Sequence, residues 1–290
     1  MKMVVLSGKG GTGKSSFVSS LALGLKEKNL TLVDADVDCP NQHILFSGKT
    51  KSRTPLHVSK IAVFDESKRI ESPRCAEVCR FDAIKIMDGK AIISSTKCEG
   101  CGACVLVCPD ELKLVPKLSG HLIVRETKHF PLVYGRLEPG ESGSGRIIFE
   151  VKKAAEKLAA ERKSPLTIVD APAGIGCPVI AAVTGCDYAV GVVEPTPASI
   201  RNMERALDVV GHFNIPFSIV MNKEGISARH EEAIRKKYGD SLLACIPYDE
   251  ETPRLLARAV PPINGKGKGA EGFRSAVKAV GKLMGERHDF

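Results

Sequence analysis

Residues 3–16 read MVVLSGKGGTGKSS, an apolar run followed by a glycine-rich loop. Residues 8–15 satisfy the pattern G-x-x-x-x-G-K-[ST], in which a loop between a strand and a helix cradles phosphates with its backbone N–H groups. Lys14 can then reach the β and γ phosphates, and the Ser15 hydroxyl is placed to bind Mg²⁺. A glycine turn without a ligand would explain neither residue. The expected nucleotide-binding residues of this loop are Gly10, Gly11, Thr12, Gly13, Lys14, Ser15 and Ser16.

The rest of the chain continues the alternation of strands and helices that begins at this loop. Apolar runs predict strands at 3–6, 30–33, 166–169, 188–193, 217–221 and 243–246. Helical patterns separate them, among others at 14–28, 199–212 and 228–238. Nearly continuous apolar strands separated by helices are typical of a parallel sheet that is covered on both faces. The expected fold class is therefore α/β, with a doubly wound, mostly parallel sheet.

Composition narrows the possible functions. The chain has 290 residues, which at roughly 150 residues per domain suggests two domains, and its hydrophobic content of 43% excludes intrinsic disorder. The net charge of +8 suits an anionic ligand or an acidic partner. Because the basic excess is spread along the chain and aromatic residues make up only 5%, nucleic acid is not an expected partner. No signal peptide is recognised and residues 176–193 are interrupted by Pro178 and Asp187, so we expect a cytoplasmic protein without a membrane anchor.

Cysteines mark a second module. Six of the ten cysteines fall between Cys75 and Cys108, and in a cytoplasmic chain such density favours metal ligation over disulfides. The run Cys98-x2-Cys101-x2-Cys104-x3-Cys108-Pro109 has the spacing of a bacterial ferredoxin, in which the fourth cysteine serves the other cluster. Tetrahedral zinc, the alternative, would not require this spacing. Upstream, Cys75 and Cys79 match the last two positions of a second run, whose first two positions hold Arg69 and Ser72.

Because Arg69 and Ser72 replace two cysteines of the second run, the sequence predicts one [4Fe-4S] cluster per chain. Crossover spacing assigns to it four ligands, Cys79, Cys98, Cys101 and Cys104. Cys75 and Cys108 remain as a vestigial second site, because two thiolates are too few to hold a cubane securely. Two alternatives stay open for this pair: a redox-active disulfide, or a labile cluster shared with another subunit or a client.

Lys9, at the second position of the loop, makes the motif more specific. The run 9–16 resembles the deviant Walker A loop of the MinD/ParA/Mrp class of P-loop NTPases, and with the cysteine run the whole chain resembles the members of that class that carry an inserted ferredoxin domain. These occur in anaerobes and include the ATPases of the orange-protein complex. The resemblance implies an ATPase domain at 1–60 and 116–290, and a small α+β ferredoxin-like domain inserted at 61–115.

The resemblance also implies roles for individual residues. Lys9 would contact the nucleotide of the facing subunit in an ATP-closed dimer, and Lys14 and Asp36 would complete the catalytic set, with Asp36 positioning the attacking water. Mg²⁺ would be held by Ser15, Asp36 and Asp170. Asn222 would bind the adenine edge, and Pro247 lies in the loop that packs on the base.

Three biological roles are compatible with such a protein. ATP binding and slow, partner-stimulated hydrolysis could switch a dimer that assembles a metal cluster in a client metalloprotein of an anaerobe, and this is the role we rank first. Alternatively, ATP could gate electron delivery as in the nitrogenase iron protein, or the protein could be a positioning ATPase of cell division like MinD and ParA. The expected ligands are ATP or ADP, Mg²⁺ and one cluster. The dimer partner would be a second copy or a paralogue.

Overall fold

The computed structural model describes residues 1–141 and 144–286, so the last four residues of the expected ATPase domain, 287–290, lie outside the described residues. The chain divides into two compact units. The first contains Met1–Arg53, Leu122–Arg136 and the chain from Ser144 onward, and the second contains Thr54–His121 and a segment that begins at Leu137. The second unit extends beyond the expected bounds of 61–115, because the strands that flank the cysteine-rich segment pair with each other and belong to the same unit.

The first unit is built on one sheet. Within the described residues its strand order is β13-β12-β11-β1-β10-β2-β9-β8-β3. Every neighbouring pair from β13 to β9 is parallel. The strands are β1 (Lys2–Ser7), β2 (Leu30–Asp34), β3 (Gly48–Leu56), β8 (Gly120–Thr127), β9 (Pro131–Leu137), β10 (Leu166–Ala173), β11 (Tyr188–Val193), β12 (Phe217–Glu224) and β13 (Leu242–Pro247).

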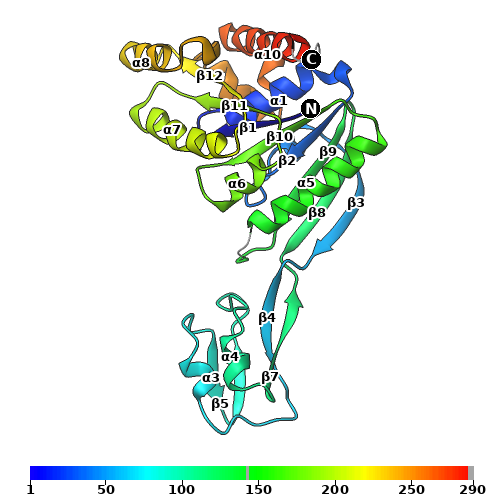
Figure 1. The fold of residues 1–290 in the computed structure, drawn as a ribbon. Helices are drawn as coiled ribbons and strands as arrows, with labels where there is room; N and C mark the ends of the chain where they lie inside the picture. The colour runs from blue at the N-terminus through cyan, green and yellow to red at the C-terminus, as the bar shows by residue number, and fades with distance from the viewer. Residues whose placement is uncertain (142–143, 287–290) are drawn as a thin grey trace. The chain divides into compact units, whose positions relative to one another are not determined.

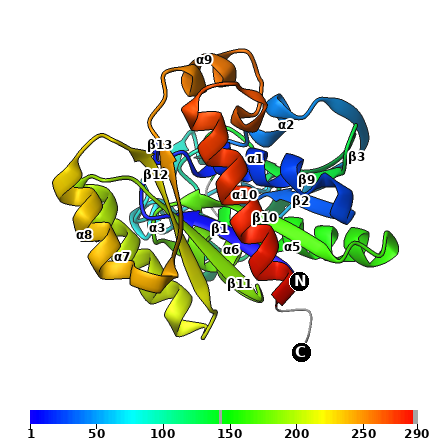
Figure 2. The ribbon, with the colours of Figure 1, turned by 90° about the horizontal axis from the view of Figure 1, so that it is seen from above.

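Helices cover both faces of this sheet (Figures 1 and 2). They are α1 (Lys14–Gly24), α2 (Gln42–Leu45), α5 (Ser144–Glu161), α6 (Cys177–Val183), α7 (Pro197–His212), α8 (Ala228–Tyr238), α9 (Glu251–Ala257) and α10 (Lys268–Glu286). Short 3₁₀ turns accompany them at Lys26–Lys28, Gly239–Ser241 and Pro262–Asn264. None of the helices in the described part of the chain is both long and apolar enough to span a bilayer.

The alternation of side chains along β1 shows why the sheet is covered twice. Met3 and Val5 are fully buried in a core with Phe17 of α1 and Phe273 of α10. Val4, between them, is equally buried, and successive side chains of a strand point to opposite faces. Helices α1 and α10 pack on each other, whereas α5 and α6 pack together and contact β10. This arrangement confirms the mostly parallel α/β sheet.

The topology brings three strand ends to one edge of the sheet. β1, β10 and β2 are neighbours and run in the same direction. In register, Val5 pairs with Asp170 and Asp170 pairs with Asp34. Since ligands of open α/β sheets bind outside the carboxyl ends of the strands, the loop that follows β1 and both aspartates occupy the position where a site is expected.

The second unit contains two small antiparallel strand pairs and two short helices. β4 (Ser59–Phe64) pairs with β7 (Leu112–Lys117), and β5 (Ile84–Met87) pairs with β6 (Lys90–Ile93). The helices are α3 (Arg74–Glu77) and α4 (Ala103–Val107). Its core consists of Ala62, Ile70, Cys75, Ile84, Ala91, Cys104, Cys108 and Leu112. Cysteines therefore supply much of the interior of this small unit.

Candidate functional site

The loop between β1 and α1 has a shape that requires glycine. Gly13 precedes the helix with φ of +88°, and a Cβ there would come within 2.1 Å of Asn222 Nδ2. At Gly8 a Cβ would lie 2.2 Å from the backbone carbonyl carbon of Asn202 in α7. A left-handed conformation and close approach by another element both exclude larger residues. The loop is thus held between α7 and β12 at the N-terminus of α1.

Two cavities meet at this loop. The smaller, of about 240 Å³, is lined by Ser7, Gly10, Gly11, Thr12, Gly13, Lys14, Ser15, Ser16, Asp36, Asn41 and Ala173. The larger, of about 450 Å³, is lined by Gly11, Gly13, Ser16, Asn222, Lys223, Pro247, Tyr248, Asp249, Thr252, Pro253 and Leu256. They share Gly11, Gly13 and Ser16. A nucleotide with its phosphates in the smaller cavity and its base in the larger one would fit this arrangement. The smaller cavity is called the phosphate cavity below. The expected base residues Asn222 and Pro247 lie in the larger cavity.

Lys14 and Asp170 form a buried ion pair beside the smaller cavity. The Lys14 ammonium contacts Asp170 Oδ1 and donates to Ser15 Oγ over 3.3 Å, and the side chain is only 6% exposed. Asp170 is fully buried. A buried charge needs a partner of opposite sign, and each of these two side chains supplies one for the other. A phosphate entering the loop would offer Lys14 a second anion.

Asp34, two residues before Asp36 in the sequence, has a different environment from Asp36. Asp34 is fully buried, and its carboxylate accepts the amide hydrogens of Asp36, Asn41 and Gln42 at 2.8–3.1 Å. Burial and the negative charge of Asp170 raise the pKa of Asp34 to about 7, while the amides of Gln42 and Asn41 oppose the rise. Asp34 therefore shapes the segment after β2, and Asp36 is the carboxylate in the wall of the phosphate cavity.

We expect Asp34 to make the nucleotide-free protein less stable as the pH rises from about 4 to about 7. Within this window the unfolded chain has released the Asp34 proton, whose ordinary pKa is 3.8, and the native protein still holds it. The native state then binds more protons, so the free energy of unfolding falls with increasing pH. Urea unfolding of the wild type and Asp34→Asn at several pH values measures this contribution. The stability of the wild type relative to the variant should fall by on the order of 1–3 kcal/mol across the window. A difference that stays constant would show that Asp34 is ionised throughout.

Lys9 points back into its own chain. Its ammonium lies 2.7 Å from Glu194 Oε1, and Lys223 approaches Glu194 Oε2 at 2.6 Å and the Gly11 carbonyl at 2.7 Å. Burial acts against the charged form, but the two lysines lower the pKa of Glu194. The residue expected to reach a facing subunit is thus paired with Glu194 in the single chain. The Lys9 side chain is about one third exposed.

The second unit gathers the four predicted cluster ligands. Cys79, Cys98, Cys101 and Cys104 line one cavity, together with Ala62, Phe81, Ala83, Ile84, Glu99, Gly100, Gly102, Ala103 and Leu114. Burial, then Cys98 and Cys101, raise the pKa of the Cys104 thiol. The Ala83 amide donates to Cys79 Sγ over 3.4 Å. Within the described residues, no three His, Cys, Asp or Glu side chains form a group arranged to hold a metal ion. The cysteines share a cavity without converging on one point.

Cys75 and Cys108 lie together in the core of the same unit, apart from that cavity lining. Burial and hydrogen bonding with Cys108 raise the pKa of Cys75 to about 11. Both are free thiols. Arg69, at a missing ligand position, does not fill this site: its side chain is exposed and donates to the Asp88 carbonyl over 3.0 Å.

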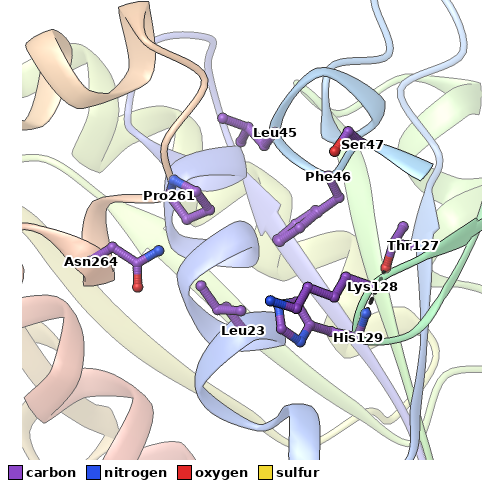
Figure 3. A pocket seen from close by; sticks show the side chains of 9 residues that line it. All are labelled: Leu23, Leu45, Phe46, Ser47, Thr127, Lys128, His129, Pro261 and Asn264. Carbon is purple, nitrogen blue, oxygen red and sulfur yellow. Dashed lines mark hydrogen bonds between the residues drawn. The ribbon is translucent and has the colours of Figure 1, made fainter.

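A further cavity, of about 190 Å³, lies near the end of α2 (Figure 3). Its lining residues are Leu23, Leu45, Phe46, Ser47, Thr127, Lys128, His129, Pro261 and Asn264. Within it, the His129 amide donates to Thr127 Oγ1 over 3.3 Å. It shares no lining residue with the two cavities at the loop. None of the predicted site residues lies in it.

Sequence reasoning missed three residues that the structure brings to the loop. Gln42, Glu194 and Lys223 each contact a predicted site residue or a loop carbonyl. Glu194 directly follows β11 and Lys223 is the residue before the last one of β12, so an inspection of the residues at strand ends could have found them. Nothing in the spacing of Gln42 indicated its position.

Comparison with known proteins identifies the family of this chain. The CbiA family model, described as the CobQ/CobB/MinD/ParA nucleotide binding domain, matches residues 3–263. The chain belongs to this family.

Relatives of this CobQ/CobB/MinD/ParA family member occur in Methanocaldococcus jannaschii. Uncharacterized protein MJ0578 is 38% identical over 285 residues, which cover 98% of each chain. Uncharacterized protein MJ0579 is 31% identical over 231 residues, 78% of this chain and 81% of its own. Uncharacterized ferredoxin MJ0155 is 33% identical over 72 residues, which are 25% of this chain and 44% of the ferredoxin.

Solved structures show the same fold. The septum site-determining protein MinD complexed with Mg-ADP, from Pyrococcus horikoshii, has a TM-score of 0.60 and 19% identity, with 98% of this chain and 97% of that chain covered. MinD in the MinC:MinD complex of Aquifex aeolicus has a TM-score of 0.58 and 18% identity, with 98% and 96% covered. At these identities the likeness concerns the fold, and it confirms the MinD/ParA-type sheet expected from the phosphate loop.

The CobQ/CobB/MinD/ParA site also fits a magnesium nucleotide chemically. Thr12 Oγ1 and Asn41 Oδ1 are buried without a hydrogen-bond partner within the described part of the chain, and both residues line the phosphate cavity. Buried polar atoms are normally paired, so a polar ligand there would satisfy them. Ser15, Asp36 and Asp170 supply the hard oxygen atoms that Mg²⁺ prefers. When bound, Mg²⁺ would neutralise phosphate charge.

Proposed function

We propose that this chain is a dimeric, ATP-hydrolysing iron-sulfur protein that assembles or matures a metal cluster in a client complex. The observation that carries the proposal is that one chain combines a complete phosphate loop with four cysteines of ferredoxin spacing lining one cavity. The first module binds and hydrolyses ATP, and the second holds one [4Fe-4S] cluster. Joined in one polypeptide, they let nucleotide state control the cluster.

The nucleotide part of the proposal rests on the residues around the phosphate cavity. Lys14 is buried beside the loop in an ion pair with Asp170, and Asp36 lies in the cavity wall. Burial raises the pKa of Asp36, with Lys14 opposing the rise. A carboxylate of raised basicity next to the γ-phosphate position is suited to orient and polarise an attacking water. We assign this role to Asp36.

The cluster part rests on three features of the second unit. Four thiols are the ligand number of a [4Fe-4S] cluster, and the four of them line one cavity. Cys101 lies between Gly100 and Gly102, which both have positive φ. Glycines in this conformation let the chain turn tightly around a ligand. The partial similarity to a ferredoxin of M. jannaschii points to the same chemistry.

The dimer rests on Lys9. The Lys9 side chain is about one third exposed, so its contact with the buried Glu194 can be exchanged for one with a phosphate. Lys223 remains beside Glu194 and would keep that buried carboxylate paired. A second copy is the first candidate for the facing subunit. Because M. jannaschii holds two relatives of this chain, a paralogue is the alternative.

The first test of the role uses anaerobically reconstituted protein and a generic apo-ferredoxin as acceptor. Assembly predicts that iron and sulfide move to the acceptor faster with ATP than without it. An ATP-gated electron donor would instead keep its iron while its reduced cluster becomes oxidised in the presence of ATP and an electron acceptor. Retention of both iron and electrons under all nucleotide conditions would contradict both roles and favour a positioning ATPase.

The dimer has its own prediction. Lys9→Ala should leave ATP affinity within about tenfold of the wild type, roughly 1.4 kcal/mol, because Lys14 and the loop amides remain. ATP-dependent dimerisation and turnover should be lost. Light scattering with ATP or a non-hydrolysable analogue measures the first, and phosphate release measures the second. Lys49→Ala, which alters an exposed lysine of β3, is the control. The role of Lys9 would be contradicted if the wild type and Lys9→Ala were both monomeric with ATP and hydrolysed it at the same rate.

A further inference from the structure

Gln42 is the first residue of α2 and lies between the two buried aspartates and the phosphate loop. Its side chain is fully buried. The backbone amide donates to Asp34 Oδ2 over 3.0 Å, and the side-chain Nε2 donates to Asp170 Oδ2 over 2.7 Å and to the Ser15 carbonyl over 3.0 Å. One residue thus connects the ends of β2 and β10 with the first turn of α1.

The orientation of the Gln42 amide follows from its partners. Asp170 Oδ2 and the Ser15 carbonyl are both acceptors, so the group facing them must be the NH₂. Its two hydrogens are then both used. Oε1 is left, and it is buried without a hydrogen-bond partner within the described part of the chain.

An unpaired buried acceptor is costly unless a ligand completes it. Oε1 cannot bind a phosphate oxygen or a carboxylate, because these also only accept. It can be satisfied by a donor, and the donor that accompanies a magnesium nucleotide is water, since Mg²⁺ usually keeps several waters when it binds phosphates.

Gln42 also controls the direction of Asp170. One Asp170 oxygen contacts Lys14 and the other accepts from Gln42. When Lys14 turns to a phosphate, the bond from Gln42 is what still holds the carboxylate. Asp34 is the neighbour of Asp170 in register. The side-chain amide of Gln42 is neutral, so it donates to Asp170 without adding charge where these two acidic side chains lie close together.

On the basis of the proposed magnesium-nucleotide site, we propose that Gln42 is a positioning residue. It holds Asp170 in the orientation that serves the metal and accepts a hydrogen bond, through Oε1, from a water that arrives with Mg²⁺. Its effect should therefore appear in the metal dependence of nucleotide binding more than in binding of the nucleotide itself.

The test measures ADP affinity of the whole protein by calorimetry, with excess EDTA and with Mg²⁺. The ratio of the two affinities is the magnesium enhancement. Gln42→Met, an apolar side chain of similar shape, should change the EDTA affinity by less than about threefold and reduce the enhancement at least tenfold, about 1.4 kcal/mol. Thr31→Val, which removes another fully buried hydrogen-bonding group at the opposite end of β2, should keep the wild-type enhancement.

A second variant provides a readout that general destabilisation would not produce. Gln42→Glu places a carboxylate against Asp170. Because Asp34 also titrates near pH 7, the enhancement of the variant is divided by that of the wild type at the same pH. This ratio should be small at pH 8 and partly recovered at pH 5.5, where the new group can be protonated. Thermal unfolding checks that each variant is folded. An unchanged enhancement in Gln42→Met, or no pH-dependent recovery in Gln42→Glu, would overturn the role of Gln42 alone. Absence of any nucleotide binding by the wild type would overturn the proposed function, and this role with it.

Discussion

Asp36→Ala is expected to lower the rate of ATP hydrolysis about a thousandfold, roughly 4 kcal/mol of activation free energy, and to leave ATP bound. Positioning of a nucleophile in line with the γ-phosphate accounts for an effect of this size. Asp36 lies in the wall of the phosphate cavity and is about half-buried. Among the described residues, its carboxylate accepts one weak hydrogen bond, from the Cys39 backbone amide at 3.3 Å. It can hold a water without breaking other contacts.

The neighbouring aspartates act as internal comparisons. Asp34 uses both carboxylate oxygens to accept backbone amides, so its loss should disturb folding of the segment after β2 before it disturbs chemistry. Asp38 is exposed, and Asp38→Ala serves as the control. Single-turnover assays with bound ATP separate hydrolysis from release. Near wild-type hydrolysis in Asp36→Ala, together with a slow Asp38→Ala, would transfer the role to Asp38.

The sequence predicted those parts of the site that are local or that the resemblance to a known family implies. Residues 8–13 form the loop and residues 14–16 begin α1, so the glycines and the helix that follows them are contiguous in the sequence. Asp170 lies far along the chain from the loop, and only the resemblance to the MinD/ParA/Mrp class assigned it to the site. In the structure, the parallel pairing of β1, β10 and β2 brings the ends of these three strands to one edge of the sheet.

Side-chain partners across the fold were not predictable in this way. Lys9 pairs with Glu194 because α7 and β11 pass beside the loop, and Gln42 meets Asp170 because the segment after β2 folds back over α1. Such contacts depend on the exact packing of elements that are distant in sequence. The pairing of β4 with β7 was likewise not predictable, since neither strand contains a cysteine and only the structure shows that they lie side by side.

The positions of the cysteines depend partly on local spacing and partly on contacts between distant segments. Cys98, Cys101 and Cys104 are close in sequence, and their spacing alone predicts a shared site. Cys79 joins them only if the chain crosses over, and in the structure it lines the same cavity, whereas Cys75 and Cys108 contact each other in the core. Cys79 and Cys108 both occupy the fourth position of a run. Because of the crossover, Cys79 lines the cavity of the predicted cluster ligands, whereas Cys108 lies outside it.

Anaerobic reconstitution should give about four irons per chain, and Cys79→Ser should remove nearly all of them. Serine is a poor substitute for a thiolate ligand, and three cysteines leave one iron without protein sulfur. Cys108→Ser should keep about four irons, because Cys108 contacts Cys75 outside the cavity of the four ligands. The two variants make the same chemical change at equivalent positions of the two runs, so each controls for the other. Iron and sulfide analysis with electron paramagnetic resonance of the reduced protein provides the measurement. About eight irons per chain would show that the vestigial pair still holds a cluster, and loss of the four-iron cluster in Cys108→Ser would overturn the assignment of its ligands.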